Sequence, residues 1–150
     1  MKLESKAYDP FNAYSIALKK IEESGIIPTK QRRILAKILF QKGNRHISAE
    51  NLFDEVKKED RKISMATIYN TLKQFTNLGL IREIVVDKNK SLYDTNNKPH
   101  YHLYIEDEGK VHDIPTDNIN LDLPSVPACL NLHNIDVIVR VRSLKNNKKS

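Results

Sequence analysis

The segment from Ser64 to Gly79 constrains the fold of this chain more than any other stretch. Ser64 is a strong N-cap residue, because its hydroxyl can accept a hydrogen bond from a backbone N–H of the first turn. Gly79 can adopt the left-handed conformation that closes a helix. Between these ends, apolar residues recur at helical spacing and predict one buried face; they are Met65, Ile68, Leu72 and Phe75. The segment therefore predicts an amphipathic helix.

The polar side of this expected helix carries no acidic residue. Neutral hydrogen-bonding side chains form one stripe, and a tyrosine and a lysine flank it; the stripe is Thr67, Asn70, Thr71 and Gln74, and its flanks are Tyr69 and Lys73. Neutral amides and hydroxyls suit base edges in a DNA major groove, and Lys and Tyr suit phosphates. An ordinary solvated helix face is the alternative that this pattern alone leaves open.

Three further helices are expected before this segment and a hairpin after it. The first lies between Pro10 and Gly25, and the next two begin after the N-cap residues Thr29 and Ser48. Residues 81–86 and 91–95 alternate apolar and polar positions around a polar turn, which predicts a β-hairpin. Helices followed by a hairpin with lysines at its tip describe a winged helix, which is a variant of the helix-turn-helix.

Basic residues occupy the first turn of the second expected helix, where they oppose the helix dipole. These residues are Lys30, Arg32 and Arg33. Phosphate contact would explain them, and a solvated face is the alternative. Lys88 and Lys90 in the hairpin are expected to reach an adjacent groove.

Charge divides the chain into a basic first part and a mildly acidic second part. Residues 1–95 hold 18 Lys and Arg against 12 Asp and Glu, whereas residues 96–144 hold 4 against 7. This asymmetry favours a polyanion-binding domain at 1–95 joined to a second domain at 96–144. Residues 145–150 are expected to be a disordered basic tail.

The remaining composition favours a cytoplasmic protein with no membrane partner. The single cysteine, Cys129, excludes an intramolecular disulfide and suits a reducing compartment. The start of the chain has no apolar signal-peptide region, and no apolar run approaches the length of a membrane span.

The second part is expected to consist mainly of strands. One strand, beginning at His100, places His100 and His102 on the same face. The last expected strand, residues 134–142, is apolar on both faces. Because such strands are usually covered on both sides, a second copy of the chain is the expected cover.

Four short motifs occur in an order and at a spacing that resemble one known family. They are Thr29-x-x-Arg32, His46-x-Ser48-Ala49-Glu50, Ala66-Thr67-x-Tyr69-x-x-Leu72 and His100-x-His102. The chain resembles the ferric uptake regulator (Fur) family over residues 13–142, and it is most similar to the iron response regulator (Irr) branch. The resemblance implies a homodimeric transcriptional regulator that binds an AT-rich, two-fold-related operator in double-stranded DNA. It also implies an α+β fold, in which a winged-helix domain precedes a small α/β dimerisation domain.

The resemblance further implies one ligand site between the two domains. Its five positions match His46, Asp94, His100, His102 and Asp113, a mixed nitrogen and oxygen set suited to Fe²⁺, Mn²⁺ or Zn²⁺. The cysteines of the family's structural zinc site are replaced by Ile105 and Glu108, so no such site is expected. The Irr branch suggests haem as another ligand, matched here by His100, Tyr101 and His102.

The sequence thus predicts a DNA-binding regulator without catalytic residues. The residues expected at the DNA are Lys30, Arg32, Arg33, Ser64, Thr67, Tyr69, Asn70, Thr71, Lys73, Gln74, Lys88 and Lys90. Two alternatives remain open: a winged-helix repressor that ignores metals, and a metal-dependent hydrolase that uses the His/Asp positions.

Overall fold

The computed structural model describes residues 10–144. The chain divides between Asn97 and Lys98 into two compact units, here called unit 1 (Met1–Asn97) and unit 2 (Lys98–Ser150). The domain boundary predicted from the sequence, between residues 95 and 96, lies two residues earlier. The expected basic tail, residues 145–150, lies outside the described residues.

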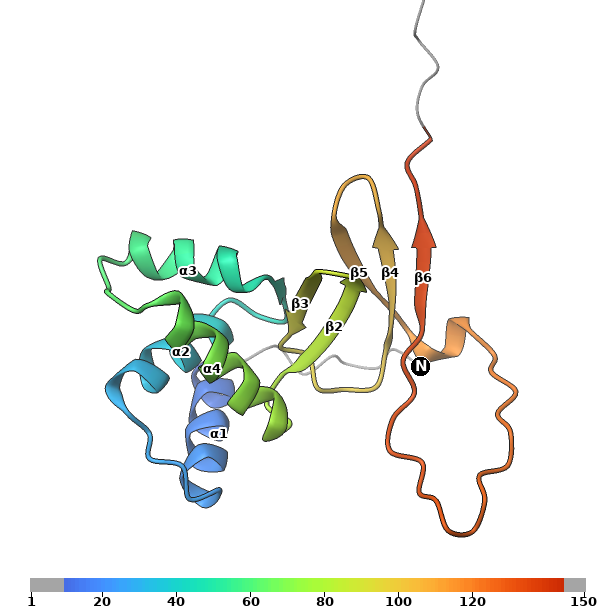
Figure 1. Cartoon of the computed structure of the whole chain (residues 1–150), viewed down its shortest axis with the longest axis horizontal. Coiled ribbons are helices and arrows are strands. Elements are labelled where there is room, and N and C mark those ends of the chain that lie inside the picture. The colour runs from blue at the N-terminus through green and yellow to red at the C-terminus, as the bar shows by residue number, and fades with distance from the viewer. Residues whose placement is uncertain (1–9, 145–150) are drawn as a thin grey trace, which may run out of the picture. The chain divides into compact units, whose positions relative to one another are not determined.

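The described part of unit 1, residues 10–97, contains four helices and a small antiparallel sheet (Figure 1). Its elements are α1 (Pro10–Glu23), α2 (Lys30–Phe40), β1 (His46–Ile47), α3 (Ala49–Lys58), α4 (Met65–Asn77), β2 (Arg82–Asp87) and β3 (Lys90–Asp94). Helices α2 to α4 followed by the β2–β3 hairpin form the expected winged helix, and α1 packs against α2.

Polar caps fix the helix ends of unit 1 where the sequence predicts them. The side-chain oxygens of Thr29, Ser48 and Ser64 accept hydrogen bonds from backbone N–H groups in the first turns of α2, α3 and α4. Gly79 follows α4 with a φ of 70°, a left-handed conformation that favours glycine. These four residues confirm the predicted boundaries.

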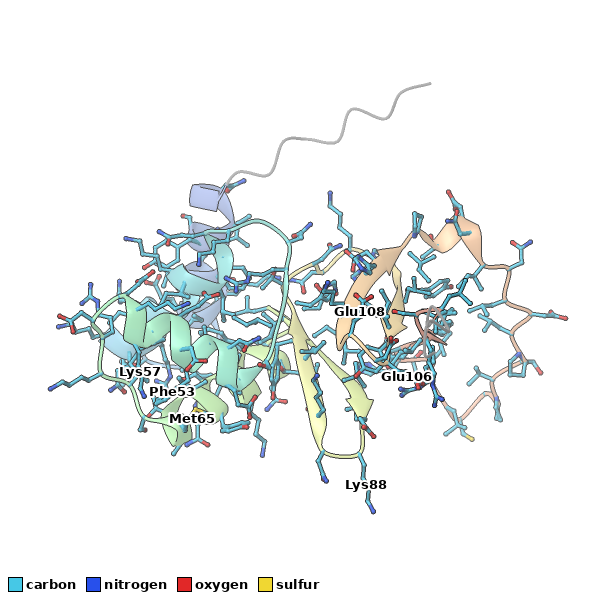
Figure 2. The ribbon with its side chains drawn as sticks, turned by 90° about the horizontal axis from the view of Figure 1, so that it is seen from above. Phe53, Lys57, Met65, Lys88, Glu106 and Glu108 are labelled. Carbon is cyan, nitrogen blue, oxygen red and sulfur yellow. The ribbon has the colours of Figure 1, made fainter. Side chains whose placement is uncertain are left out.

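The sheet of unit 1 has the strand order β1–β3–β2. His46 of β1 lies opposite Asp94 of β3, and Arg82 of β2 lies opposite the same aspartate. The hairpin register shifts between Val85 and Asp87, so a bulge precedes the tip. Lys88 lies at this tip, at the free end of the hairpin (Figure 2).

The helices of unit 1 enclose one hydrophobic core. Ile68, Leu72 and Phe75 of α4 are at most 1% exposed, and they belong to a cluster that also includes residues of α1, α2 and α3. Met65 is partly buried against this cluster. The apolar stripe that the sequence predicts is therefore the face of α4 that packs inward.

Unit 2 contains a three-stranded sheet with the order β5–β4–β6. Its strands are β4 (Tyr101–Ile105), β5 (Lys110–Ile114) and β6 (Ile138–Val141), and a short 3₁₀ helix, η1 (Thr116–Asn118), follows β5. Strand β5 pairs antiparallel with β4, and β6 pairs parallel with it. Residues 119–137 form the irregular connection that a parallel pairing requires.

Burial is much lower in unit 2. Among the described residues of this unit, Tyr104, at 5% exposure, is the one buried hydrophobic side chain. Across residues 10–144, no helix is long and apolar enough to cross a membrane.

Candidate functional site

Helix α4 presents a polar face without a carboxylate of its own. Tyr69, Asn70 and Lys73 are exposed, and Thr67 and Gln74 are half-buried. A groove runs between this face and the N-terminal turn of α2, and its lining includes Thr29, Asn70 and Gln74. The face has the donors, acceptors and positive charge that a DNA groove requires.

Thr71, which the sequence also predicts at the DNA, lines this groove as well but is the least exposed residue of the stripe. Its side chain is only 3% exposed. The reason is helical geometry, because Thr71 follows Ile68 by three residues and precedes Phe75 by four. Both of those residues lie in the core.

The N-terminus of α4 uses its hydroxyls internally. Ser64 Oγ accepts a hydrogen bond from Thr67 N at 3.2 Å and donates one to Thr67 Oγ1 at 2.9 Å. Ser64 therefore holds the first turn of α4 and the side chain of Thr67 in a fixed arrangement.

Tyr69 has a partner that the sequence gives no signal for. Its hydroxyl donates to Glu50 Oε1 of α3 at 2.6 Å, across 19 residues of sequence. This hydrogen bond is the main reason why the pKa of Glu50 is lowered and that of Tyr69 is raised. The phenol expected at a phosphate is thus engaged by a carboxylate at the edge of the same face.

The basic residues of α2 differ in their environment. Lys30 and Arg33 are exposed, and Arg33 Nε donates to the backbone oxygen of Pro28 at 3.0 Å. Arg32 is half-buried and donates from Nε to Gln74 Oε1 at 2.9 Å and from Nη1 to the backbone oxygen of Ile27 at 2.6 Å. In the hairpin, Lys88 and Lys90 are exposed.

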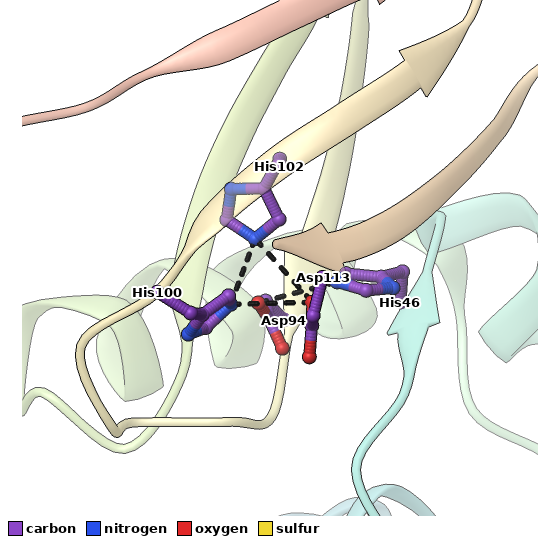
Figure 3. A group of neighbouring side chains, drawn as sticks. All are labelled: His46, Asp94, His100, His102 and Asp113. Carbon is purple, nitrogen blue, oxygen red and sulfur yellow. Dashed lines mark hydrogen bonds and ion pairs between the residues drawn. The ribbon is translucent and has the colours of Figure 1, made fainter. Parts of the chain in front are cut away.

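Unit 1 also contains a pair of side chains able to bind a metal, His46 and Asp94 (Figure 3). His46 Nε2 lies 3.2 Å from Asp94 Oδ2, because β1 and β3 place the two residues opposite each other. Asp94 is fully buried, and its Oδ1 accepts a hydrogen bond from the backbone N–H of Asn96 at 2.8 Å.

Unit 2 contains three more such side chains, here called the unit 2 cluster: His100, His102 and Asp113 (Figure 3). His102 and Asp113 are paired in the β4–β5 register, and His100 lies just before β4. The Nε2 atoms of the two histidines are 2.9 Å apart, and Asp113 Oδ1 lies 3.3 Å and 3.9 Å from them.

The unit 2 cluster fits a metal ion. His100 Nδ1 lies 2.6 Å from the backbone oxygen of Lys98. Because a carbonyl only accepts, Nδ1 carries the proton, and a neutral ring then has Nε2 available as a ligand. The convergent atoms are two imidazole nitrogens and one carboxylate oxygen, a set suited to iron, manganese or zinc.

Tyr101 does not converge with these histidines. It precedes His102 in β4, so the two side chains point to opposite faces of the sheet. Ile105 and Glu108 stand at the positions that match the cysteines of the family's structural zinc site. Ile105 is half-buried and Glu108 is exposed, and neither supplies a thiolate.

The fold and these side chains define a class, that of winged-helix, DNA-binding regulators with side chains able to hold a metal. A family model described as the ferric uptake regulator family matches residues 23–140. The chain belongs to this family of metal-responsive transcriptional regulators.

Individual relatives agree with this assignment. The peroxide-responsive repressor PerR of Staphylococcus aureus is 29% identical over 104 residues, which cover 69% of this chain and 70% of that protein. The solved ferric uptake regulator of Vibrio cholerae aligns with a TM-score of 0.67 at 22% identity, covering 83% of this chain and 98% of that chain. The regulator of Pseudomonas aeruginosa, solved with manganese, aligns with a TM-score of 0.66 at 19% identity, covering 87% and 99%. These structures confirm the α+β fold with an N-terminal winged helix.

Proposed function

We propose that the protein is a homodimeric regulator of iron or haem homeostasis that binds an AT-rich, two-fold-related operator. Helix α4 enters the major groove with Thr67, Asn70 and Gln74 toward the bases. Lys30, Arg33 and Lys73 neutralise phosphates, and Lys88 and Lys90 of the hairpin reach the adjacent groove. The proposal is supported by the exposure of Asn70 and of these five basic residues in unit 1, with Thr67 and Gln74 half-buried beside them.

One observation carries the proposed control by metal: donor atoms suited to the same ion occur in both units. His46 and Asp94 belong to the sheet that includes the DNA-binding hairpin, and the unit 2 cluster belongs to the other sheet. We infer that one Fe²⁺ or Mn²⁺ ion takes ligands from both sets, and Zn²⁺ would suit the same donors.

Shared ligation would couple the ion to DNA binding. An ion held by both units restricts their relative orientation, and in a dimer this orientation sets the spacing of the two α4 helices. Operator spacing is a geometric requirement for such dimers. The free energy of metal binding would therefore appear as a change in operator affinity.

Two other signals are compatible with the same residues. Haem could be ligated by His100 or His102, as the similarity to the Irr branch implies, although Tyr101 faces away from them. The Staphylococcus aureus relatives are named for their response to peroxide, and a metal held by imidazoles could make this chain peroxide-responsive too.

The test is a titration of operator binding with the apo-protein, Mn²⁺, Fe²⁺ and haem in parallel, with and without peroxide. The proposal expects at least one ligand to change operator affinity. It also expects this change to disappear in the double variant His100→Ala/His102→Ala while the dimer persists. A wild-type response in the double variant would refute the assigned ligands.

The two alternatives predict different results. A winged-helix repressor that ignores metals would bind its operator equally well under every condition of the titration. A metal-dependent hydrolase would turn over a phosphoester or amide substrate and lose this activity with chelator. Membership in a family of transcription regulators favours the absence of enzymatic activity.

A further inference from the structure

The side chain of Arg32 in α2 forms a hydrogen bond to α4, the helix proposed to enter the major groove. Nε donates to Gln74 Oε1 at 2.9 Å, across 42 residues of sequence. The same guanidinium donates from Nη1 to the backbone oxygen of Ile27 at 2.6 Å. These two hydrogen bonds hold the guanidinium between the loop before α2 and the polar face of α4.

The chemistry of the pair fixes the orientation of the Gln74 amide. A guanidinium has N–H donors and no acceptor, so the amide must turn its oxygen toward Arg32. The NH₂ group of Gln74 is then directed away from Arg32. Both residues line the groove beside α4 together with Asn70 and Lys73, so the pair lies within the proposed DNA-binding face.

We propose that Arg32 is a positioning residue for sequence readout, which makes Gln74 act as a hydrogen-bond donor toward the operator. This inference rests on the proposed DNA-binding function. It also adds a second role for Arg32, since two of the five N–H donors of its guanidinium are used on Gln74 and Ile27.

A donor-only Gln74 has a definite base preference. Glutamine reads adenine by accepting from N6 and donating to N7, which requires both ends of the amide. With Oε1 facing a positive guanidinium, Gln74 favours a base edge that presents acceptors. In the major groove these are thymine O4, adenine N7 and the N7 and O6 atoms of guanine, whereas cytosine presents only a donor.

Arg33 provides a matched control on the same helix. It is also an arginine in the first turn of α2, but its Nε donates to the backbone oxygen of Pro28 and it is exposed. Arg32→Ala and Arg33→Ala each remove one positive charge, so they differ mainly in the loss of the Gln74 contact. Arg32→Lys keeps the charge and removes the Nε donor.

The experiment measures binding of the full-length protein to an operator, to every single-base-pair variant of it, and to a scrambled duplex. Gln74→Ala should reduce discrimination about tenfold at one operator position per half-site, the scale of one side-chain–base interaction. Arg32→Ala and Arg32→Lys should reduce discrimination at that same position, and Arg32→Ala/Gln74→Ala should reduce it no further. Arg33→Ala should weaken all duplexes alike and lower the dependence on salt.

Several outcomes would overturn the inference. The inference is wrong if Arg32→Ala weakens binding to cognate and scrambled DNA equally, as Arg33→Ala should. It is also wrong if the losses of discrimination from Arg32→Ala and Gln74→Ala fall at different operator positions, or if they add in the double variant. If Arg32→Ala unfolds the protein, Arg32→Lys with an unchanged melting curve decides the question. Failure of the wild-type protein to bind any duplex would refute the proposed function itself.

Discussion

The two units of this chain differ in how completely they bury their apolar residues. In unit 1, Leu72 and Phe75 are at most 1% exposed and belong to a core built from all four helices. In unit 2, Leu123 is 51% and Leu130 is 63% exposed, and the strands of the sheet are mostly half-buried. Unit 1 therefore closes a hydrophobic core of its own, although single residues such as Ile27 stay exposed, whereas unit 2 closes no comparable core among its described residues.

This difference indicates different sources of stability. A unit with a closed core can fold on its own, whereas a small unit whose apolar side chains stay uncovered, here in the connection of residues 119–137, requires cover from outside. A second copy of the chain supplies such cover in the proposed dimer, and it also brings two DNA-binding units together. In this proposal unit 1 folds without help from the dimer. The dimer sets the distance between its two copies of unit 1.

The largest effect is expected from Phe75→Ala in the core of unit 1. Deleting a buried phenylalanine side chain costs about 3–5 kcal/mol of the free energy of unfolding. Leu132→Ala is the control in unit 2, because Leu132 is 55% exposed and should cost well under 1 kcal/mol in unfolding of unit 1. Urea denaturation followed by circular dichroism measures both, and equal losses would contradict the contrast between the units.

A smaller effect is expected from the metal ligands. If one ion takes ligands from both units, His46→Ala and His102→Ala should each lower Mn²⁺ affinity by about 100-fold. Loss of a direct ligand should cost at least as much as loss of a residue that only hydrogen-bonds to a ligand. His112→Ala is the control, since His112 is exposed and precedes Asp113. Isothermal titration calorimetry distinguishes the cases: an effect of His102→Ala alone would place the whole site in unit 2.

Dimer strength should respond to the exposed leucines of unit 2. We expect the exposed side chains of Leu130 and Leu132, which precede β6, to lie in the dimer interface. Leu130→Ser/Leu132→Ser removes both and should weaken association at least tenfold. Ile27→Ser is the control in unit 1, where Ile27 is 75% exposed. Sedimentation equilibrium measures the dissociation constants, and unchanged values for the double variant would place the interface elsewhere.

The local structure of unit 1 could be predicted from the sequence because its signals are local. N-cap residues, Gly79 and the 3–4 residue spacing of Ile68, Leu72 and Phe75 each act within one helix. The exception is Thr71, whose polar side chain suggests an exposed position although its helical neighbours leave it only 3% exposed.

Side-chain partners that are distant in sequence could not be predicted in this way. Tyr69 meets Glu50, and Arg32 meets Gln74, only because α2, α3 and α4 pack together. Only the family resemblance predicts the ligand-competent residues, since no periodicity connects His46 to Asp94. Their pairing follows from the register of β1 and β3.

The smallest effect is expected from a partly buried ion pair of unit 1. Glu55 of α3 pairs with Arg45 through two hydrogen bonds, one of them 3.1 Å from Nη1 to Oε2, and Lys42 Nζ lies 3.4 Å from Oε2. Burial opposes ionisation of Glu55, but the hydrogen bonds and charges of Arg45 and Lys42 together outweigh it, so its pKa is lowered from 4.5. The ionised carboxylate therefore stabilises the folded state.

The sign of the pH dependence follows from this lowered pKa. A carboxyl group that is more acidic in the folded protein contributes stability above pH 4.5, and this contribution is lost as the pH falls through the folded pKa. Glu55→Gln should cost about 1 kcal/mol at pH 7, and the variant and wild-type curves should converge below pH 4.5.

Glu108→Gln provides the matching change in unit 2. The pKa of Glu108 is also lowered, chiefly by a hydrogen bond from Ser143, but the carboxylate is exposed. Its replacement should leave the unfolding transition of unit 1 unchanged at every pH. Equal shifts from the two variants would show that the units unfold as one, because a charge in unit 2 can affect the stability of unit 1 only through a shared transition.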